Sequence, residues 1–178
     1  MGGHKKIFAH PRVVAQQTEV SCWAAALESW FSVVNDPARA KNQPELMKDF
    51  PLVPNGKDFN KIFRMYVTKF GMSTQWMSLD DFPVQITHML AKWGVLFIAY
   101  HCESTSPWYH DVILYGVDTD DLGLTTYLVM NPSWKWSESR KMVPAGYQTW
   151  RRDYFFPVPD DNEVLVGWRE KNSPGKVY

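Results

Sequence analysis

Two β-rich segments joined by a short polar spacer constrain the fold of this chain more than any other feature. The segments read DVILYGVD (111–118) and TTYLVMN (125–131), and the spacer DTDDLG (118–123) is rich in turn-forming residues. Short apolar runs with β-branched and aromatic residues, separated by Asp and Gly, are typical of an antiparallel hairpin. The sequence therefore predicts that strands 112–117 and 125–130 pair with each other.

The rest of the chain divides into a helical first half and a β-rich second half. Periodic apolar patterns predict helices at 22–34, 44–50, 58–70 and 80–93. Further strands are predicted at 94–101, 142–143, 154–156 and 163–168. Helices followed by antiparallel strands indicate an α+β fold, and no linker divides the 178 residues, so we expect a single domain over 1–178. Residues 1–11 and 169–178 are expected to be extended tails.

The charge balance and the lack of long apolar runs give no support for several classes of partner. Lys plus Arg equal Asp plus Glu at 19 each, whereas nucleic-acid and anionic-membrane binding usually need a basic face. The longest apolar run, 94–100, is far shorter than the roughly 20 residues of a membrane helix, and the N-terminus lacks the apolar core of a signal peptide. We therefore expect a monomer without nucleic-acid or membrane partners, cytoplasmic or exported by a route independent of such a signal.

Cys22 lies where a polar loop meets the apolar, alanine-rich segment CWAAALESWFSVV (22–34). Apolar residues at helical spacing predict a helix with one buried face, and Ser21 is its expected N-cap. At the first turn of a helix, the backbone amides and the helix dipole favour a thiolate, as a nucleophile requires. Two alternatives stay open: Cys22 is a small core residue, or it forms a disulfide with Cys102.

A cysteine nucleophile also needs a base and a group that orients this base. Among five histidines, His110 is the one that opens the predicted strand 111–118. A hairpin centred between residues 120 and 121 puts Asn131 directly opposite His110, where Cβ atoms are about 5 Å apart. The Asn131 amide can then hold the imidazole ring, although an Asn-Pro pair is also an ordinary strand-ending turn.

Gln16, six residues before Cys22, is a candidate donor to the oxyanion that forms during attack on a carbonyl group. Gln17 competes for this role, and a solvated loop glutamine is the simpler interpretation of either residue. The acidic spacer 118–123 lacks the long ligand pattern of a calcium loop, so it is interpreted as a solvated turn.

Together these residues resemble the papain-like cysteine peptidases. The pattern is Q-x5-C-W-A-A, then a histidine that opens a strand, then N-P-S-W, and it covers roughly residues 12–136. The resemblance is closest to the compact bacterial branch of the family, which includes effector peptidases. It implies a papain-like fold in which the helix of the nucleophile, Cys22, packs on a C-terminal antiparallel sheet. It also implies that His110 is the general base and acid, that Asn131 orients it, and that Gln16 completes the oxyanion hole.

The resemblance further implies a secreted bacterial effector or toxin, a thiol protease that hydrolyses peptide bonds through an acyl-enzyme without any metal or organic cofactor. The expected partners are a protein or peptide substrate and an immunity or activating protein. Trp23, Trp108 and Trp134 are the expected substrate-binding residues, and Trp134 is also similar to the tryptophan that shields the Asn–His hydrogen bond in the family. Equally, aromatic residues at these positions pack at strand ends.

The chain departs from the family in ways that leave its substrate open. It lacks the C-G-S-C-W motif and the several disulfides of the plant and lysosomal members, and many compact bacterial members have aspartate where this chain has Asn131. A cysteine amidase of peptidoglycan, or a glutamine deamidase or transglutaminase, uses the same Cys–His pair. Those groups usually lack a glutamine six residues before the cysteine. A non-catalytic binding domain, in which Cys22 is a packing residue, is the third possibility.

Overall fold

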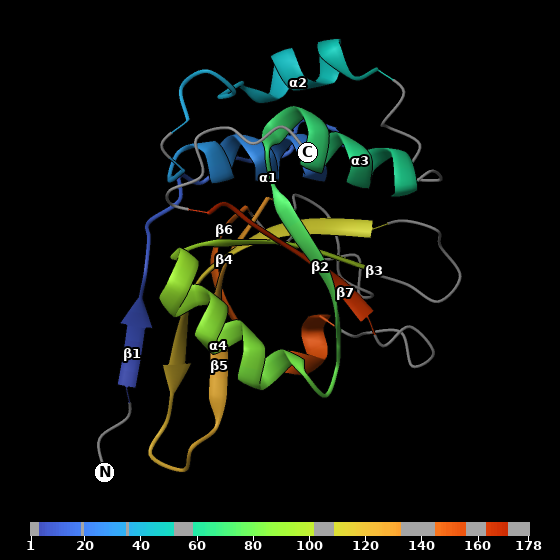
Figure 1. The fold of residues 1–178 in the computed structure, drawn as a ribbon. Helices are drawn as coiled ribbons and strands as arrows, with labels where there is room; N and C mark the ends of the chain where they lie inside the picture. The colour runs from blue at the N-terminus through green and yellow to red at the C-terminus, as the bar shows by residue number, and fades with distance from the viewer. Residues whose placement is uncertain are drawn as a thin grey trace.

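An antiparallel sheet of seven strands forms the centre of the molecule (Figure 1). The computed structural model describes residues 4–18, 20–34, 36–51, 59–101, 109–132, 145–155 and 163–170. Within these ranges the strands are β1 (His4–Ile7), β2 (Ser73–Ser78), β3 (Leu96–His101), β4 (Tyr109–Thr119), β5 (Thr125–Asn131), β6 (Gly146–Trp150) and β7 (Glu163–Trp168). The strand order is β2-β7-β3-β4-β5-β6, and β1 pairs with β4 outside this order.

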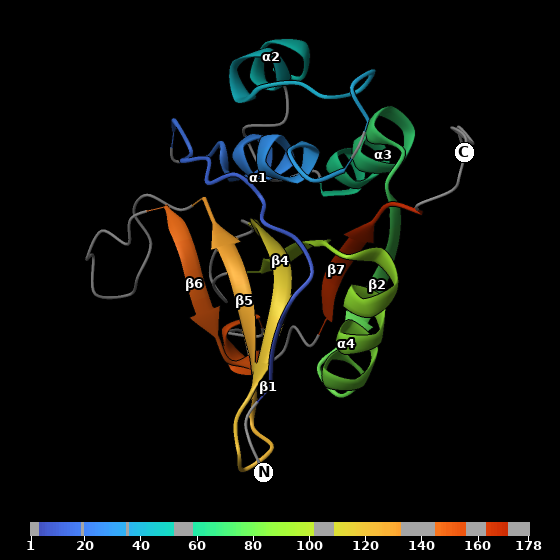
Figure 2. The ribbon, with the colours of Figure 1, turned by 90° about the vertical axis from the view of Figure 1, so that its left-hand side faces the viewer.

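Four α-helices surround this sheet in the described part of the chain. They are α1 (Cys22–Phe31), α2 (Gln43–Asp49), α3 (Phe59–Phe70) and α4 (Phe82–Trp93). A short 3-10 helix, η2, covers Arg152–Phe155. Helices α1, α2 and α3 gather at one end of the strands, whereas α4 lies on the other side of the sheet (Figures 1 and 2). Within the described residues, none of the helices combines the length and the apolar character needed to span a lipid bilayer.

Each face of the sheet carries its own hydrophobic core because neighbouring residues of a strand point to opposite faces. Along β4, Ile113 and Tyr115 join the core of α1 and α3, whereas Val112 and Leu114 join the core of α4. We call these two sides the α1 face and the α4 face. This alternation determines which side chains of β4 face α1 and which face α4, and therefore where the residues of the candidate site lie.

All four predicted helices are present, with ends that differ by a few residues. Gly71 and Gly94 follow α3 and α4 with positive φ angles of 62° and 87°, as expected for residues that end a helix. Helix α1 ends earlier than predicted, at Phe31 rather than Val34. There the amide of Ser32 donates to the Ser29 carbonyl, which tightens the chain into a turn.

The expectation of an all-helical first half is wrong, because β1 and β2 both belong to the sheet. Strand β1 pairs with β4, and β2 pairs with β7. The expected tail at 1–11 therefore contains a strand, and at the other end Arg169 forms an ion pair with Asp36 instead of belonging to a tail. All four residues of β1 are exposed, so no alternating apolar pattern marks this strand in the sequence.

The strands of the second half are mostly as predicted. β3 lies within the predicted range 94–101, and β5 and β7 have the predicted bounds. The prediction at 154–156 is wrong for its described residues, which belong to η2, and β6 was missed. The strand predicted at 142–143 lies outside the described residues.

The predicted hairpin of β4 and β5 is confirmed, but its register differs. Ile113 pairs with Met130, two positions from the predicted register, and a bulge between Leu114 and Gly116 shifts the pairing further. The turn is tighter than expected because Asp120 Oδ1 accepts hydrogen bonds from the next backbone amides along the turn, at 2.9 and 2.8 Å. At the end of the hairpin that carries Ile113 and Met130, the shift of two residues leaves opposed side chains on their expected face, so the prediction for that end survives the error.

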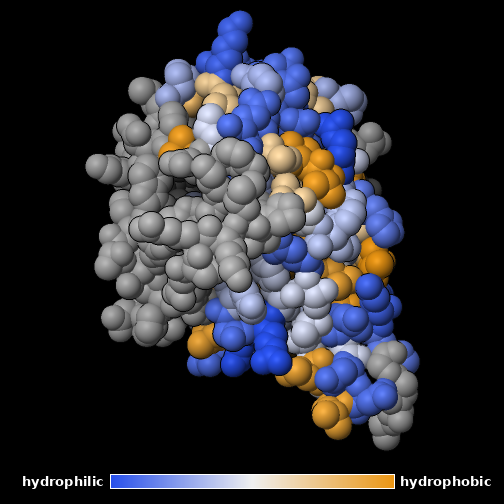
Figure 3. Space-filling model, turned by 180° about the vertical axis from the view of Figure 1, so that it is seen from behind, coloured by the Kyte–Doolittle hydropathy of each residue, from blue (hydrophilic) through white to orange (hydrophobic). Residues whose placement is uncertain are grey.

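Hydrophobic groups on the surface are separated from one another. The coloured part of the rear face shows several small hydrophobic areas among hydrophilic ones (Figure 3). The most exposed large apolar side chain in the described ranges is Leu122 at the hairpin turn, at 93%. Such scattered exposure is ordinary for a folded domain.

Gly116 is required where β1 crosses close to β4. A Cβ atom added there would lie 2.6 Å from the Lys6 carbonyl oxygen and 2.9 Å from Leu128 Cδ1. We expect Gly116→Ala to lower the free energy of unfolding by about 1–3 kcal/mol, because β1 or the sheet must shift. Urea denaturation measures this change. Gly146→Ala is the control, since no atom lies within 4 Å of its added Cβ; an equal loss in both variants would contradict the close approach.

Candidate functional site

The predicted site residues gather at the end of the sheet where β4 begins and β5 ends. This end of the strands lies directly beside α1 (Figure 2). Cys22 is the first residue of α1, His110 is the second residue of β4, and Asn131 is the last residue of β5. Three segments that are distant in the sequence therefore bring polar side chains to one region.

His110 and Asn131 are in direct contact, as predicted. His110 Nε2 lies 2.8 Å from Asn131 Oδ1. The register of the hairpin puts Asn131 opposite Val112 rather than opposite His110, so the predicted direct opposition is wrong and the pair is diagonal. Diagonal neighbours on one face of a sheet remain within reach when one side chain is long.

A chain of hydrogen bonds sets the orientation of the Asn131 amide. Asn131 Nδ2 donates to Gln148 Oε1 at 3.2 Å, and Trp150 Nε1 donates to the same oxygen at 2.8 Å. The Asn131 Oδ1 atom therefore faces the imidazole, and this assigns the ring proton to Nε2 of His110. Nδ1 is left as the atom of His110 that can accept a proton.

His110 is only partly accessible, and its surroundings favour the neutral ring. Tyr100, directly opposite on β3, packs edge-on against it with ring centres 5.6 Å apart. Burial lowers the pKa of His110, and the hydrogen bond to Asn131 opposes this shift. A neutral imidazole at neutral pH is the form that a general base requires.

Cys22 is buried, with 8% of its surface exposed, and it lies against the first residues of β4. Its Sγ is 3.7 Å from the carbonyl oxygen of Tyr109 and 3.7 Å from Asp111 Oδ2. Ser21 occupies the N-cap position, but its side chain does not cap α1 as predicted. Instead, the Ser21 hydroxyl accepts from the Thr18 amide and donates to the Thr18 carbonyl, which closes the turn before the helix.

Asp111 is the functional candidate that sequence reasoning missed. Only 4% of it is exposed, and besides Cys22 its carboxyl meets the Tyr66 hydroxyl at 3.4 Å, on Oδ1. Burial raises the pKa of Asp111 to about 7, although the hydrogen bonds from Tyr66 and Cys22 lower it. The available signal was an acidic residue directly before the apolar run VILY (112–115), because a buried acidic residue is rare unless the charge has partners.

The alternation of β4 separates these residues into two pairs. Asp111 and Cys22 lie on the α1 face, and His110 and Asn131 lie on the α4 face. In the part of the chain that the structure describes, His110 thus meets Asn131, and the side chains of Cys22 and His110 approach the end of β4 from different sides. The described contacts join the thiol to Tyr109 and Asp111 of β4, and the imidazole to Asn131 of β5.

Gln16 is buried, whereas Gln17 is exposed. The backbone amide of Gln16 donates to the carbonyl of Pro132, the residue after Asn131, at 3.0 Å. The side-chain Nε2 of Gln16 donates to the Thr18 carbonyl at 2.9 Å, and its Oε1 is buried without a hydrogen-bond partner among the described residues. Burial and the contact with Pro132 favour Gln16 over Gln17 as a site residue, but the side-chain amide of Gln16 is directed at its own loop.

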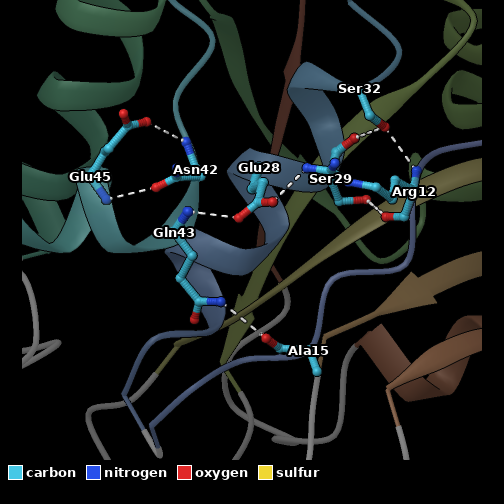
Figure 4. Close-up of polar contacts among 8 residues, drawn as sticks. All are labelled: Arg12, Ala15, Glu28, Ser29, Ser32, Asn42, Gln43 and Glu45. Atoms are coloured by element: carbon cyan, nitrogen blue, oxygen red, sulfur yellow. Dashed lines mark hydrogen bonds and ion pairs between the residues drawn. The ribbon is translucent and has the colours of Figure 1, made fainter.

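Gln43 holds the loop that carries Gln16 (Figure 4). The Gln43 side chain is buried and joins both neighbours of Gln16: Nε2 donates to the Ala15 carbonyl at 3.0 Å, and Oε1 accepts from the Gln17 amide at 2.9 Å. Its own backbone amide donates to Glu28 of α1. Loop, α1 and α2 are therefore connected through one residue that sequence reasoning did not identify.

The predicted substrate-binding tryptophans are only partly accounted for. Trp23 is 4% exposed and packs in the core of the α1 face, so it does not line an open cleft here. Trp108, Trp134 and Cys102 lie outside the described residues. No group of three or more His, Cys, Asp or Glu side chains suited to a metal ion occurs in the described ranges.

Comparison with known proteins adds no relatives. No family model matches the chain, and no curated protein is similar to it in sequence. The papain-like resemblance therefore depends on the motif residues and their spacing alone.

The raised pKa of Asp111 makes the stability of the protein depend on pH. An unfolded aspartate has a pKa near 3.9, so the folded state binds more protons between pH 4 and about 7. The free energy of unfolding is expected to fall as the pH rises through this window, by at most about 1.4 kcal/mol for each unit of pH. Asp111→Asn should flatten this fall, as measured by urea denaturation at pH 5 and pH 8. Asp121→Asn on the exposed turn should keep the wild-type fall; a fall retained in Asp111→Asn would contradict the assignment.

Proposed function

We propose that the protein is a papain-like thiol hydrolase in which Cys22 attacks the carbonyl carbon of a peptide bond. The single observation that supports this proposal most is the 2.8 Å contact between His110 Nε2 and Asn131 Oδ1. An amide that fixes the ring through one nitrogen leaves the other nitrogen for proton transfer, which is the role of the third group in a catalytic triad. Cys22 at the first turn of α1, near the same strand end, supplies the nucleophile.

The proposed reaction has two halves. In the first, Cys22 gives its proton to Nδ1 of His110, and the sulfur attacks the carbonyl carbon. The carbon–nitrogen bond then breaks, the leaving amine takes the proton from His110, and a thioester remains. In the second half, water attacks the thioester and gives its proton to His110, the carboxylic acid leaves, and the sulfur recovers a proton.

Backbone amides at the start of α1 are the proposed donors to the oxyanion. The Ser21 hydroxyl is engaged with Thr18 and does not occupy them. Amides at a helix N-terminus carry partial positive charge and stabilise an anion placed there. Gln16 would add a second donor once its Nε2 turns from the Thr18 carbonyl.

The reaction requires a rearrangement, since the thiol and the ring lie on different sides of β4. The proposed change is rotation of the Cys22 side chain past the Tyr109 carbonyl, which is 3.7 Å from Sγ. It preserves the His110–Asn131 hydrogen bond, whereas rotation of His110 would break it. A protein or peptide substrate that enters at this strand end could favour the rotated state by binding it better.

Turnover of peptides tests the proposal. The wild-type protein, incubated with a peptide library digested from a bacterial or host proteome, should generate new termini that mass spectrometry detects. Cys22→Ala should generate none, and His110→Ala should reduce the rate by about 10²–10⁴-fold, since general-base catalysis contributes that much. His88→Ala, on the exposed side of α4, should cleave at the wild-type rate. Identical peptide patterns from the wild type and Cys22→Ala would contradict a peptidase.

Purified peptidoglycan sacculi distinguish the amidase alternative in a parallel assay. Release of stem peptides without cleavage of the library would move the substrate from proteins to the cell wall. Products from neither substrate, with both proteins folded by circular dichroism, would favour a binding domain.

Asn131 is expected to act on the rate rather than on substrate binding. Asn131→Ala removes the acceptor for His110 Nε2, so the ring loses its orientation. We expect kcat to fall by roughly 10- to 100-fold while KM changes little. Gln148→Ala should lower kcat less, because it removes a partner of Asn131 and not of His110. A rise in KM with unchanged kcat would instead assign Asn131 to substrate binding.

A further inference from the structure

The α1 face holds a buried cluster of carboxyl, phenol and thiol, in which the proposed reaction uses the thiol of Cys22 and gives no role to Asp111 or Tyr66. Asp111 lies between Cys22 of α1 and Tyr66 of α3, with Oδ2 3.7 Å from Sγ and Oδ1 3.4 Å from the hydroxyl. Asp111 is 4% exposed and Tyr66 is completely buried. In the sheet, Asp111 pairs with Ala99 of β3, which carries no charge.

The carboxyl group controls both the charge and the direction of the thiol. The Cys22 Sγ lies 3.7 Å from Asp111 Oδ2 and 3.7 Å from the Tyr109 carbonyl oxygen. The contact with Asp111 keeps the thiol on the α1 face, whereas the ring of His110 lies on the α4 face. A carboxylate beside a thiol disfavours the thiolate, because two negative charges in a buried site repel each other strongly. Tyr66 donates to the other carboxyl oxygen and thereby fixes the carboxyl plane.

We propose that Asp111, held by Tyr66, is a positioning residue that keeps Cys22 in the protonated form and directed away from His110. The part of this proposal that concerns His110 rests on the proposed function, whereas the Cys22–Asp111 part does not. The described conformation is then a resting state of the nucleophile, and activation requires Cys22 to leave Asp111. The raised pKa of Asp111 means that this carboxyl ionises near neutral pH, so its repulsion of a Cys22 thiolate increases as the pH rises through that range.

The test is the rate of Cys22 alkylation by iodoacetamide from pH 5 to pH 10, followed by mass spectrometry of the Cys22 peptide so that Cys102 does not contribute. The midpoint of the profile reports the pKa of the thiol, and the plateau at high pH reports access to the sulfur. Asp111→Asn should lower the midpoint by about one pH unit, equivalent to roughly tenfold faster labelling at pH 7. The plateau should stay at the wild-type value.

Tyr66→Phe gives an independent measurement in a variant that keeps the aromatic ring in the core. Without the phenol, the carboxyl loses a hydrogen bond that favours its ionised form, so it stays neutral to higher pH. The midpoint should move in the same direction as in Asp111→Asn, by a smaller amount. If Asp111→Asn does not fold, as judged by circular dichroism, Tyr66→Phe decides the question.

An unchanged midpoint in the folded variants would overturn the proposal. A raised plateau with the wild-type midpoint would overturn it as well, because the substitution would then have increased only the access of iodoacetamide to the sulfur. The failure of the proposed function has a different signature. In that case the library assay shows no Cys22-dependent cleavage, whereas the midpoint still falls in Asp111→Asn. Conversely, cleavage with an unchanged midpoint would retain the hydrolase and remove the role of Asp111.

Discussion

Strand β4 is the element on which the rest of the structure depends. It pairs with β3, β5 and β1, and its side chains form part of both cores. Because successive residues of a strand point to opposite faces, the adjacent residues His110 and Asp111 belong to different environments. His110 contacts the side-chain amide of Asn131, and Asp111 contacts the thiol of Cys22 and the phenol of Tyr66. Two neighbouring titratable groups thereby differ in chemistry through position alone.

This division gives the two groups opposite responses to burial. Burial disfavours the charged form of each, so it lowers the pKa of His110 and raises that of Asp111. His110, which accepts a proton in the proposed reaction, and Asp111, which keeps its proton to higher pH, are thus adjacent residues. In the proposed mechanism, the Cys22 thiol contacts Asp111 in the resting conformation and rotates to His110 for the reaction.

Much of the fold could be predicted from the sequence because its longer elements have strong patterns. The apolar periodicity of α1 and the β-rich runs of β4 and β5 indicate their structure locally. Strand β1 could not be found this way, since its exposed residues are held by backbone pairing with β4. The register of the hairpin was also beyond the sequence, because Asp120 closes a tighter turn than a symmetric spacer suggests. For the site, the His110–Asn131 contact was predictable from the hairpin. The contacts of Asp111 and Gln43 were not, since they join a strand or a loop to helices whose packing no local pattern specifies.

The contacts of Gln43 connect the helical layer to the loop that carries Gln16. The side-chain amide of Gln43 donates to the Ala15 carbonyl and accepts from the Gln17 amide, as the backbone of a paired strand would. Gln43 is also the first residue of α2, and the capping box between Asn42 and Glu45 fixes where that helix begins. The beginning of a surface helix thus helps to fix the conformation of the loop on both sides of Gln16. Unwinding one turn of α2 would withdraw both Gln43 contacts at once, and the bond from the Gln16 amide to the Pro132 carbonyl would have to hold this part of the loop without them.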